Sequence, residues 1–218
     1  MIFGWKVLLR EGVCSNKQRR RLLPDTQQNV CAVLGVLFFG LVALRCILQS
    51  VNVFLIFRST APGLPVSGYD DLSAFKLYLV DVGLLRRLSL LAPSAFGEGN
   101  RLFVEFKGAL SENYILQALM NQFEAAPRYW AVDNPHYEVD YLIQRKNDIF
   151  PVEVKSEDNV ESKSLKKFAE KYGGRIKLRV RFSMQNLKLD GDVLNIPLFM
   201  ADYADELIGM ALKRLGRG

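Results

Sequence analysis

The sequence is poor in the residues that build the commonest metal and nucleophile sites. His136 is its one histidine, so multi-histidine metal sites are excluded and a Ser-His-Asp triad would depend on this side chain alone. We expect His136 to be a solvated loop residue. The three cysteines, Cys14, Cys31 and Cys46, are odd in number and have no CxxC spacing, which suggests neither a zinc site nor a disulfide framework.

The sequence also lacks an excess of either charge over most of its length. The formal net charge is +6, but residues 1–60 hold 8 Lys and Arg against 2 Asp and Glu, which leaves 21 against 21 in the remainder. The positive charge therefore belongs to the first segment. The electroneutral remainder is a weak electrostatic footprint for nucleic-acid binding.

A phosphate-binding loop of the form G-x-x-x-x-G-K-[ST] is absent from the sequence, so the chain is not an ATPase by itself. No internal repeat or low-complexity tract occurs. A chain of 218 residues with 50% hydrophobic content is long enough to bury the core of one domain and to carry an appendage.

One long apolar run, from Val30 to Leu44 and with polar breaks to Phe57, allows two interpretations. A membrane helix over 30–57, preceded by Lys17 and Arg19–Arg21, would be an inner-membrane anchor with the N-terminus in the cytoplasm. The alternative is a buried helix or a segment not native to the domain, because the uninterrupted stretch is shorter than the roughly 20 residues of a usual span. We favour the alternative, and with it a cytoplasmic location.

The turn-rich sequence after Arg58 places a domain boundary near Thr60. We divide the chain into a basic and apolar segment (1–60), a linker with a strand and a helix (61–100), and a core domain (101–218). In the middle part, residues 75–80 are predicted to form a strand. Asp81 is expected to cap the following helix, whose apolar stripe contains Leu84, Leu85 and Leu88.

In the core domain, hydrophobic spacing predicts a helix over 102–123 that carries Glu112, two strands over 138–143 and 149–155, and a tight hairpin through Arg145-Lys146-Asn147-Asp148. A helix over 162–172 follows. A strand over 175–182 has its basic residues on one face, which suggests phosphate contact or, alternatively, a solvated face or charged edge strand. A strand over 194–200 and a helix over about 202–215 complete the domain.

The two hairpin strands carry an acidic and basic pattern. Alternation places Glu153 and Lys155 on one face of their strand, and Glu138, Asp140 and Leu142 on one face of the preceding strand. A two-residue loop faces Asp140 onto Glu153 or Lys155, whereas a three-residue loop would place it opposite Val154. The matched apolar faces favour the first register.

These residue types suit metal-dependent cleavage of a phosphodiester. Asp140 and Glu153 offer the hard oxygen ligands that magnesium prefers, and a bound magnesium lowers the pKa of its water. Lys155 would then orient that water or stabilise the transition state, and Glu112 would act as an auxiliary acid from the helix. Each residue also has an ordinary structural role open to it, such as a surface ion pair between Glu153 and Lys155.

Several segments together resemble the C-terminal domain of unknown function of prokaryotic AAA-type ATPases, with the resemblance running from about Thr60 to the end. They are residues 73–85, 108–114, 129–130, 138–143 and 151–156. That end domain is similar to the PD-(D/E)XK, restriction-endonuclease-like fold. The resemblance implies an α/β fold with an αβββαβ core and a mixed sheet. It also implies signature positions at Asp140, Glu153 and Lys155, with Glu112 as the helix acid.

The front of the chain departs from this resemblance. Residues 1–60 do not resemble the sequence that should precede residue 62, and we hypothesise a truncated or frame-disrupted front end. Three functions follow: a magnesium-dependent nuclease-like domain, a non-catalytic module that binds nucleic acid or a protein, and a membrane-anchored remnant without activity.

Overall fold

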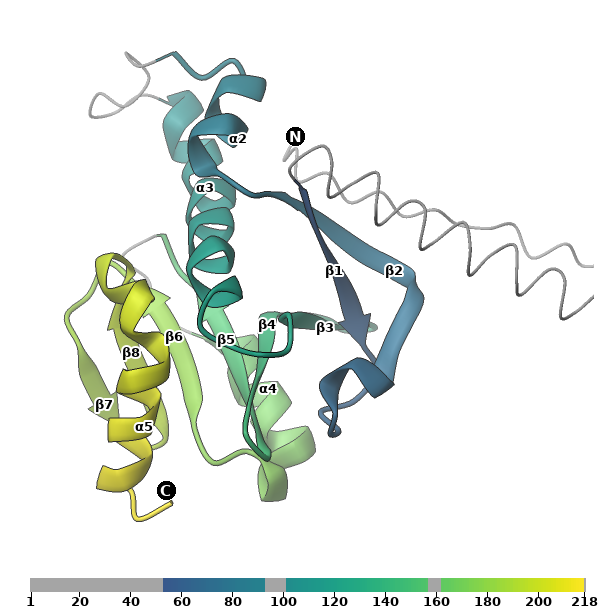
Figure 1. Cartoon of the computed structure of the whole chain (residues 1–218), viewed down its shortest axis with the longest axis vertical. Helices are drawn as coiled ribbons and strands as arrows, with labels where there is room; N and C mark the ends of the chain where they lie inside the picture. The colour runs from purple at the N-terminus through teal and green to yellow at the C-terminus, as the bar shows by residue number, and fades with distance from the viewer. Residues whose placement is uncertain (1–52, 93–100, 157–161, 218) are drawn as a thin grey trace, which may run out of the picture.

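A computed structural model describes residues 53–92, 101–156 and 162–217. They form a mixed α/β domain built on one eight-stranded sheet with the strand order β2-β1-β3-β4-β5-β6-β8-β7 (Figure 1). The strands are β1 (Val53–Ser59), β2 (Asp70–Leu79), β3 (Arg128–Asp133), β4 (His136–Arg145), β5 (Asp148–Val154), β6 (Arg179–Ser183), β7 (Lys188–Asp190) and β8 (Val193–Pro197). The α/β class with a mixed sheet, predicted above, is confirmed.

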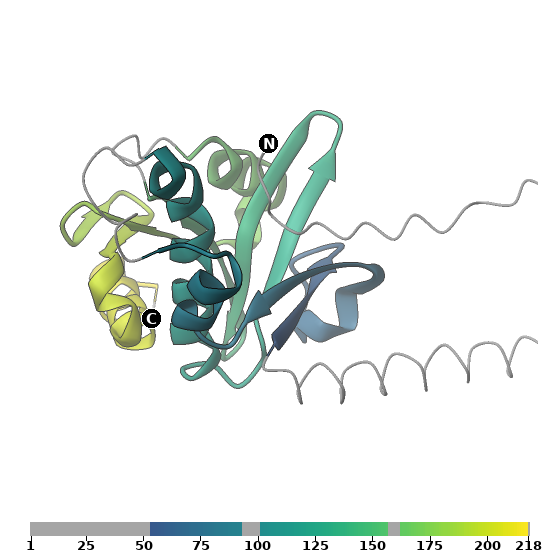
Figure 2. The ribbon, with the colours of Figure 1, turned by 90° about the horizontal axis from the view of Figure 1, so that it is seen from above.

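The helices of the described part are α2 (Val82–Leu88), α3 (Arg101–Met120), α4 (Lys163–Tyr172) and α5 (Ala204–Arg214), with 3₁₀ turns η1 (Val66–Tyr69), η3 (Gly173–Arg175) and η4 (Leu198–Tyr203). From α3 to β6 the order of elements is α, β, β, β, α, β, as the resemblance implies. Helices α3 and α5 cover one face of the sheet and α4 covers the other, as the two perpendicular views show (Figures 1 and 2).

The sheet is mixed because its hairpins are antiparallel and its crossovers parallel. Strands β1–β2, β3–β4, β4–β5 and β7–β8 are antiparallel pairs, whereas β5–β6 and β6–β8 are parallel. The β1–β2 hairpin joins the rest of the sheet through the pair Arg58 and Tyr129. Buried Arg128 holds this junction, because its guanidinium donates to both oxygens of Asp70, at 2.6 and 2.8 Å.

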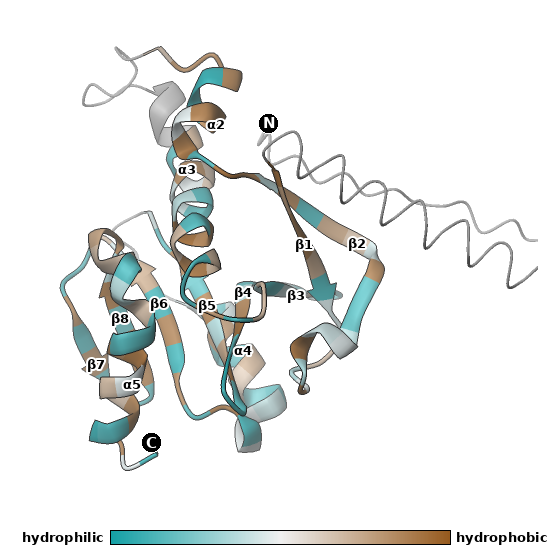
Figure 3. Ribbon diagram, viewed as in Figure 1, coloured by the Kyte–Doolittle hydropathy of each residue, from teal (hydrophilic) through white to brown (hydrophobic). Residues whose placement is uncertain are grey.

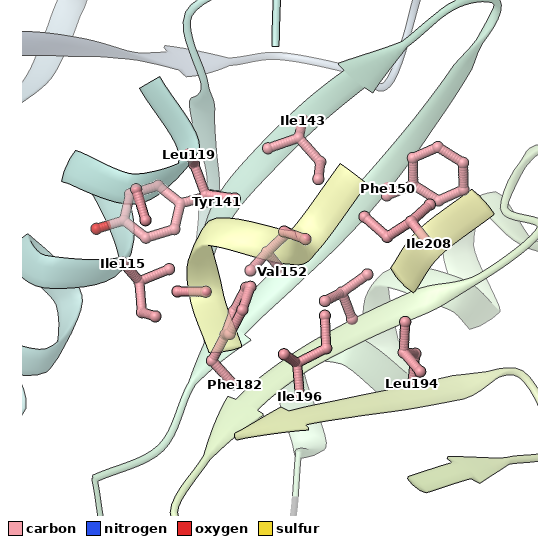
Figure 4. Close-up of a cluster of buried hydrophobic side chains, with 14 of the residues drawn as sticks. Ile115, Leu119, Tyr141, Ile143, Phe150, Val152, Phe182, Leu194, Ile196 and Ile208 are labelled. Atoms are coloured by element: carbon pink, nitrogen blue, oxygen red, sulfur yellow. The ribbon is translucent and has the colours of Figure 1, made fainter. Parts of the chain in front are cut away.

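Apolar residues recur along the strands and helices (Figure 3), and their buried side chains form two clusters. The larger cluster lies between the sheet and helices α3 and α5. It includes Ile115, Tyr141, Phe150, Val152 and Ile208 (Figure 4). The smaller cluster lies under α4 and includes Trp130, Val139, Leu142, Leu165 and Phe168. Asp140 on β4 and Glu153 on β5 therefore lie in the sheet, between these two apolar clusters.

Strand β1 corrects one sequence interpretation. Residues 53–57, the last part of the membrane helix considered above as the less favoured interpretation, form a strand, and residues 30–52 lie outside the described residues. The sheet also continues across the predicted boundary near Thr60, because β1 precedes it and pairs with β2 after it. Among the helices of the described ranges, none is long and apolar enough to span a membrane.

Several local predictions are confirmed and others change. Asp81 caps α2 by accepting a hydrogen bond from the Leu84 backbone N–H at 2.8 Å. The hairpin loop is tight, as predicted, and Lys146 within it has a positive φ of 53°. The strand predicted over 175–182 begins only at Arg179, since η3 ends at Arg175 and residues 176–178 belong to no helix or strand.

Candidate functional site

The β4–β5 hairpin has the register that the sequence favours. Tyr141 pairs with Val152 and Arg145 with Asp148, so a two-residue loop joins the strands and Asp140 comes opposite Glu153. The backbone N–H of Val154 donates to Asp140 Oδ2 at 2.8 Å. This bond ties the Asp140 side chain to the end of β5.

The predicted alternation along β4 is wrong, because β4 carries a bulge. Arg128 pairs with Leu142 but Trp130 pairs with Val139, so Asp140 and Tyr141 together oppose Tyr129 alone. A bulge re-aims the side chains that follow it. As a result Leu142 packs in the same cluster as Val139, under α4, instead of sharing a face with Asp140.

Helix α3 brings Glu112 to the bulge. The buried side chain of Asn113 exchanges two hydrogen bonds of 2.9 Å with the backbone of Leu79, which fixes α3 against the end of β2. The Tyr141 hydroxyl donates to the Glu112 carbonyl at 2.9 Å, and the Tyr78 hydroxyl donates to Glu112 Oε2 at 3.3 Å. Glu112 and Asp140 are thus neighbours, as predicted.

Lys76 is a site residue that the sequence interpretation missed. Its ammonium forms an ion pair with Glu138, and the two side chains are 12% and 17% exposed. The same nitrogen lies 5.1 Å from the centre of the Tyr129 ring. Burial by itself would lower the pKa of Lys76, but Tyr78, Glu112, Asp140 and Glu138 outweigh it and raise that pKa above its ordinary 10.5. Lys76 is therefore a buried cation among three carboxylates.

The alternation of residues along β2 could have identified Lys76 as a buried charge. Ala74 and Tyr78, the neighbours two positions before and after it on β2, are both buried, so alternation places Lys76 on the buried face of its strand. A lysine on such a face needs an anionic partner, because a buried charge is costly unless it is paired. The partners Glu112, Glu138 and Asp140 come from α3 and β4, which spacing along β2 cannot indicate.

Asp140 has the most perturbed environment of these acids. Burial, together with the nearby carboxylates of Glu112 and Glu153, raises the pKa of Asp140 well above its ordinary value. Lys76 and the Val154 N–H act in the opposite direction and lower that pKa. The balance favours the protonated form of Asp140 over a wider pH range than a solvated aspartate would show.

Glu153 and Lys155 form a second polar group at the end of β5. Lys155 Nζ lies 2.6 Å from Glu153 Oε1. Val152 and Val154 pack with the cluster beside α3, so alternation turns the buried Glu153 side chain toward the other face. Glu153 Oε2 is buried and has no hydrogen-bond partner among the residues that the structure describes. That oxygen is a buried acceptor that still requires a partner.

The arrangement does not supply a ready magnesium site. Within residues 53–92, 101–156 and 162–217, no three His, Cys, Asp or Glu side chains are grouped so that they could hold a metal ion. Asp140 accepts from a backbone N–H, Glu153 is paired with Lys155, and Lys76 supplies the positive charge beside Asp140. These donors do not fit a hydrated, octahedral cation, and metal binding by Asp140 and Glu153 stays a prediction.

The basic residues predicted on one face of the strand over 175–182 largely contact other side chains. Strand β6 lies between β5 and β8, so it is not an edge strand. Arg179 pairs with Asp192, and Arg181 Nε donates to Asn195 Oδ1 at 3.0 Å. His136 is an exposed residue at the start of β4. A pocket of about 660 Å³ lies beside Arg181, and its lining contains none of the four predicted site residues.

The fold and the cluster define a mixed α/β domain with a buried lysine among carboxylates. Its central part, residues 107–199, matches the model of a family described as a domain of unknown function, DUF4143. This family is commonly found with AAA-type ATPases. The match includes Glu112, Asp140, Glu153 and Lys155. Comparison with curated proteins and with solved structures found no match.

Proposed function

We propose that the domain is a non-catalytic interaction module, built on a restriction-endonuclease-like core, that couples an AAA-type ATPase to a nucleic-acid or protein partner. The order of elements from α3 to β6 and the Asp140–Glu153 register support such a core. The family match supports the connection with ATPases. A cytoplasmic location belongs to the same proposal.

One observation carries the non-catalytic part of the proposal, namely the buried ammonium of Lys76. Phosphodiester hydrolysis requires a charge that can bind the phosphate and activate water. The side chain of Lys76 is only 12% exposed and is paired with Glu138, so its charge stabilises the fold rather than remaining available to a substrate. Such a site keeps the nuclease-like layout while a lysine inside the fold partly offsets the negative charge of Glu112, Glu138 and Asp140.

A second candidate function is magnesium-dependent hydrolysis of a phosphodiester, with Asp140 and Glu153 as metal ligands, Lys155 as the catalytic cation and Glu112 as the auxiliary acid. The unpartnered Oε2 of Glu153 favours it, because a buried carboxylate oxygen without a hydrogen bond is costly and a cation would satisfy it. This function requires Lys76 to move away from the acids.

A binding and cleavage experiment separates the two functions. Purified full-length protein is incubated with single- and double-stranded DNA and RNA, with and without magnesium, and fluorescence anisotropy is recorded beside the cleavage products. We expect no cleavage under any condition, whether or not a nucleic acid binds. An absence of nucleic-acid binding would assign the module to a protein partner.

Three variants test whether any cleavage comes from the predicted site. Lys155→Ala and Asp140→Asn remove the predicted cation and one predicted ligand, and Lys166→Ala is a matched control on the exposed side of α4. Magnesium-dependent cleavage that is lost in the first two variants and kept in the control would establish the nuclease and contradict our proposal.

A further inference from the structure

The solvent-facing side of α5 and of the preceding turn η4 carries three large apolar side chains. Phe199 is 78% exposed, Tyr203 58% and Met210 59%. Tyr203 and Met210 are seven residues apart, which places them on one side of a helix. The opposite side of α5 is buried in the core through Leu207, Ile208, Ala211 and Leu212. Single exposed apolar residues are common, but two on one side of a helix, with a third in the turn that precedes it, suggest a contact surface.

Charged residues of opposite sign bracket this stripe. The first turn of α5 contains Asp205 and Glu206, and its last turn contains Lys213 and Arg214. Asp205 is paired with Arg145. Glu206 and Lys213 are exposed, follow Tyr203 and Met210 by three positions each, and have no ion-pair partner within the described part of the chain. The surface therefore runs from acidic to basic along its apolar stripe.

The helix dipole accounts for the charges but not for the apolar residues. Acids at the start and bases at the end stabilise any helix. A purely solvated helix, however, has no reason to expose Phe199, Tyr203 and Met210 together. A partner of one charge sign, such as a nucleic acid, would meet the acidic end of the stripe unfavourably. A helix with the same charge order, running in the opposite direction, would meet opposite charge at both ends.

We propose that α5 of a second copy of this chain docks on this surface, antiparallel to the first. A two-fold axis that passes near Gly209 and Met210, midway between positions 206 and 213, brings Glu206 opposite Lys213 of the partner subunit. The same axis repeats the pair on its other side. Met210 of each copy lies beside the axis, and Tyr203 packs toward the end of the partner helix. The inference is independent of whether the domain cuts or only binds.

The oligomeric state of the full chain tests this interface. Sedimentation velocity over a range of concentrations up to about 100 µM should give a mass that approaches twice 24.7 kDa, since an interface of this kind is expected to have a micromolar Kd. Met210→Glu introduces two like charges beside the axis, and we expect it to weaken self-association about tenfold or more. Leu88→Ser, at a residue 64% exposed on α2, is the matched control and should have no effect.

A charge exchange gives the orientation. Glu206→Lys and Lys213→Glu should each weaken the dimer, because each places like charges opposite one another. The double variant E206K/K213E should restore self-association to about the wild-type level. Both positions are exposed, so the variants are expected to fold.

Three outcomes would overturn the proposal. They are a monomer at every concentration, a dimer that Met210→Glu leaves unchanged, and single charge variants that the double variant does not rescue. The second outcome would assign self-association to another surface, including residues 1–52.

Discussion

Replacing Lys76 with methionine tests the buried cluster directly. Methionine has a similar length and keeps the apolar contacts of the lysine stem, but it removes the ammonium that faces Glu138, Glu112 and Asp140. Removing one partner of a buried ion pair leaves an uncompensated charge and costs about 3–5 kcal/mol. For a chain of this size that loss lowers Tm by roughly 6–20 °C.

The loss should also depend on pH. The pKa of Lys76 is raised, so its stabilisation is fully present below the ordinary value of 10.5 and is lost only as pH rises through the folded-state value. In Lys76→Met the three carboxylates lose their counter-charge, and the pKa of Asp140, which Lys76 lowers in the wild type, rises further. Protons then relieve the repulsion as pH falls, so the variant should lose less stability at about pH 5 than at about pH 8.

Urea unfolding of wild type and variant at the two pH values measures this effect. Lys177→Met is the matched control, because Lys177 is 45% exposed and forms a surface pair with Asp148 at 3.0 Å. Its cost should stay within about 1 kcal/mol. A cost of similar size for Lys76→Met, or one that is the same at both pH values, would refute the assignment of Lys76 as the buried counter-charge.

Two further predictions concern Asp140 and the contact between Arg128 and Asp70. Asp140→Asn should raise Tm at neutral pH and above, because the raised pKa of Asp140 makes folding less favourable as pH rises from the unfolded value of 3.8 through the folded one. The gain should vanish below about pH 3, where both states are largely protonated, and an unchanged Tm at neutral pH would contradict the prediction. Arg128→Lys should destabilise the protein by about 1–3 kcal/mol in urea unfolding, because a single ammonium cannot reproduce the two-pronged contact with Asp70, whereas a neutral result would show that the junction does not need it.

Short-range patterns predicted much of the domain. The apolar side chains of Tyr141 and Ile143 match those of Val152 and Phe150 across the hairpin, which predicted its register although the bulge changes the alternation earlier in β4. Asp81 likewise identified the start of α2, because both features depend on contacts close in sequence. Strand β1 was missed because residues 53–57 extend a longer apolar run. A continuous apolar run does not distinguish a buried strand from a helix by periodicity.

The candidate site was predicted only in part, for a different physical reason. The position of the bulge at Asp140 and Tyr141 depends on Tyr129 of β3, which is not visible in the alternation of β4 itself. The anionic partners of Lys76 can be identified only when β2, α3 and β4 are packed together. Contacts between distant segments thus decide whether the predicted acids face a metal or a lysine.

Titration of the wild-type chain with magnesium tests the central claim most directly. If Lys76 already supplies the positive charge beside Asp140, isothermal titration calorimetry should detect no magnesium binding that depends on Asp140 and Glu153, and magnesium should leave Tm unchanged. Magnesium binding that raises Tm in the wild type and disappears in Asp140→Asn would contradict the account and establish the metal site.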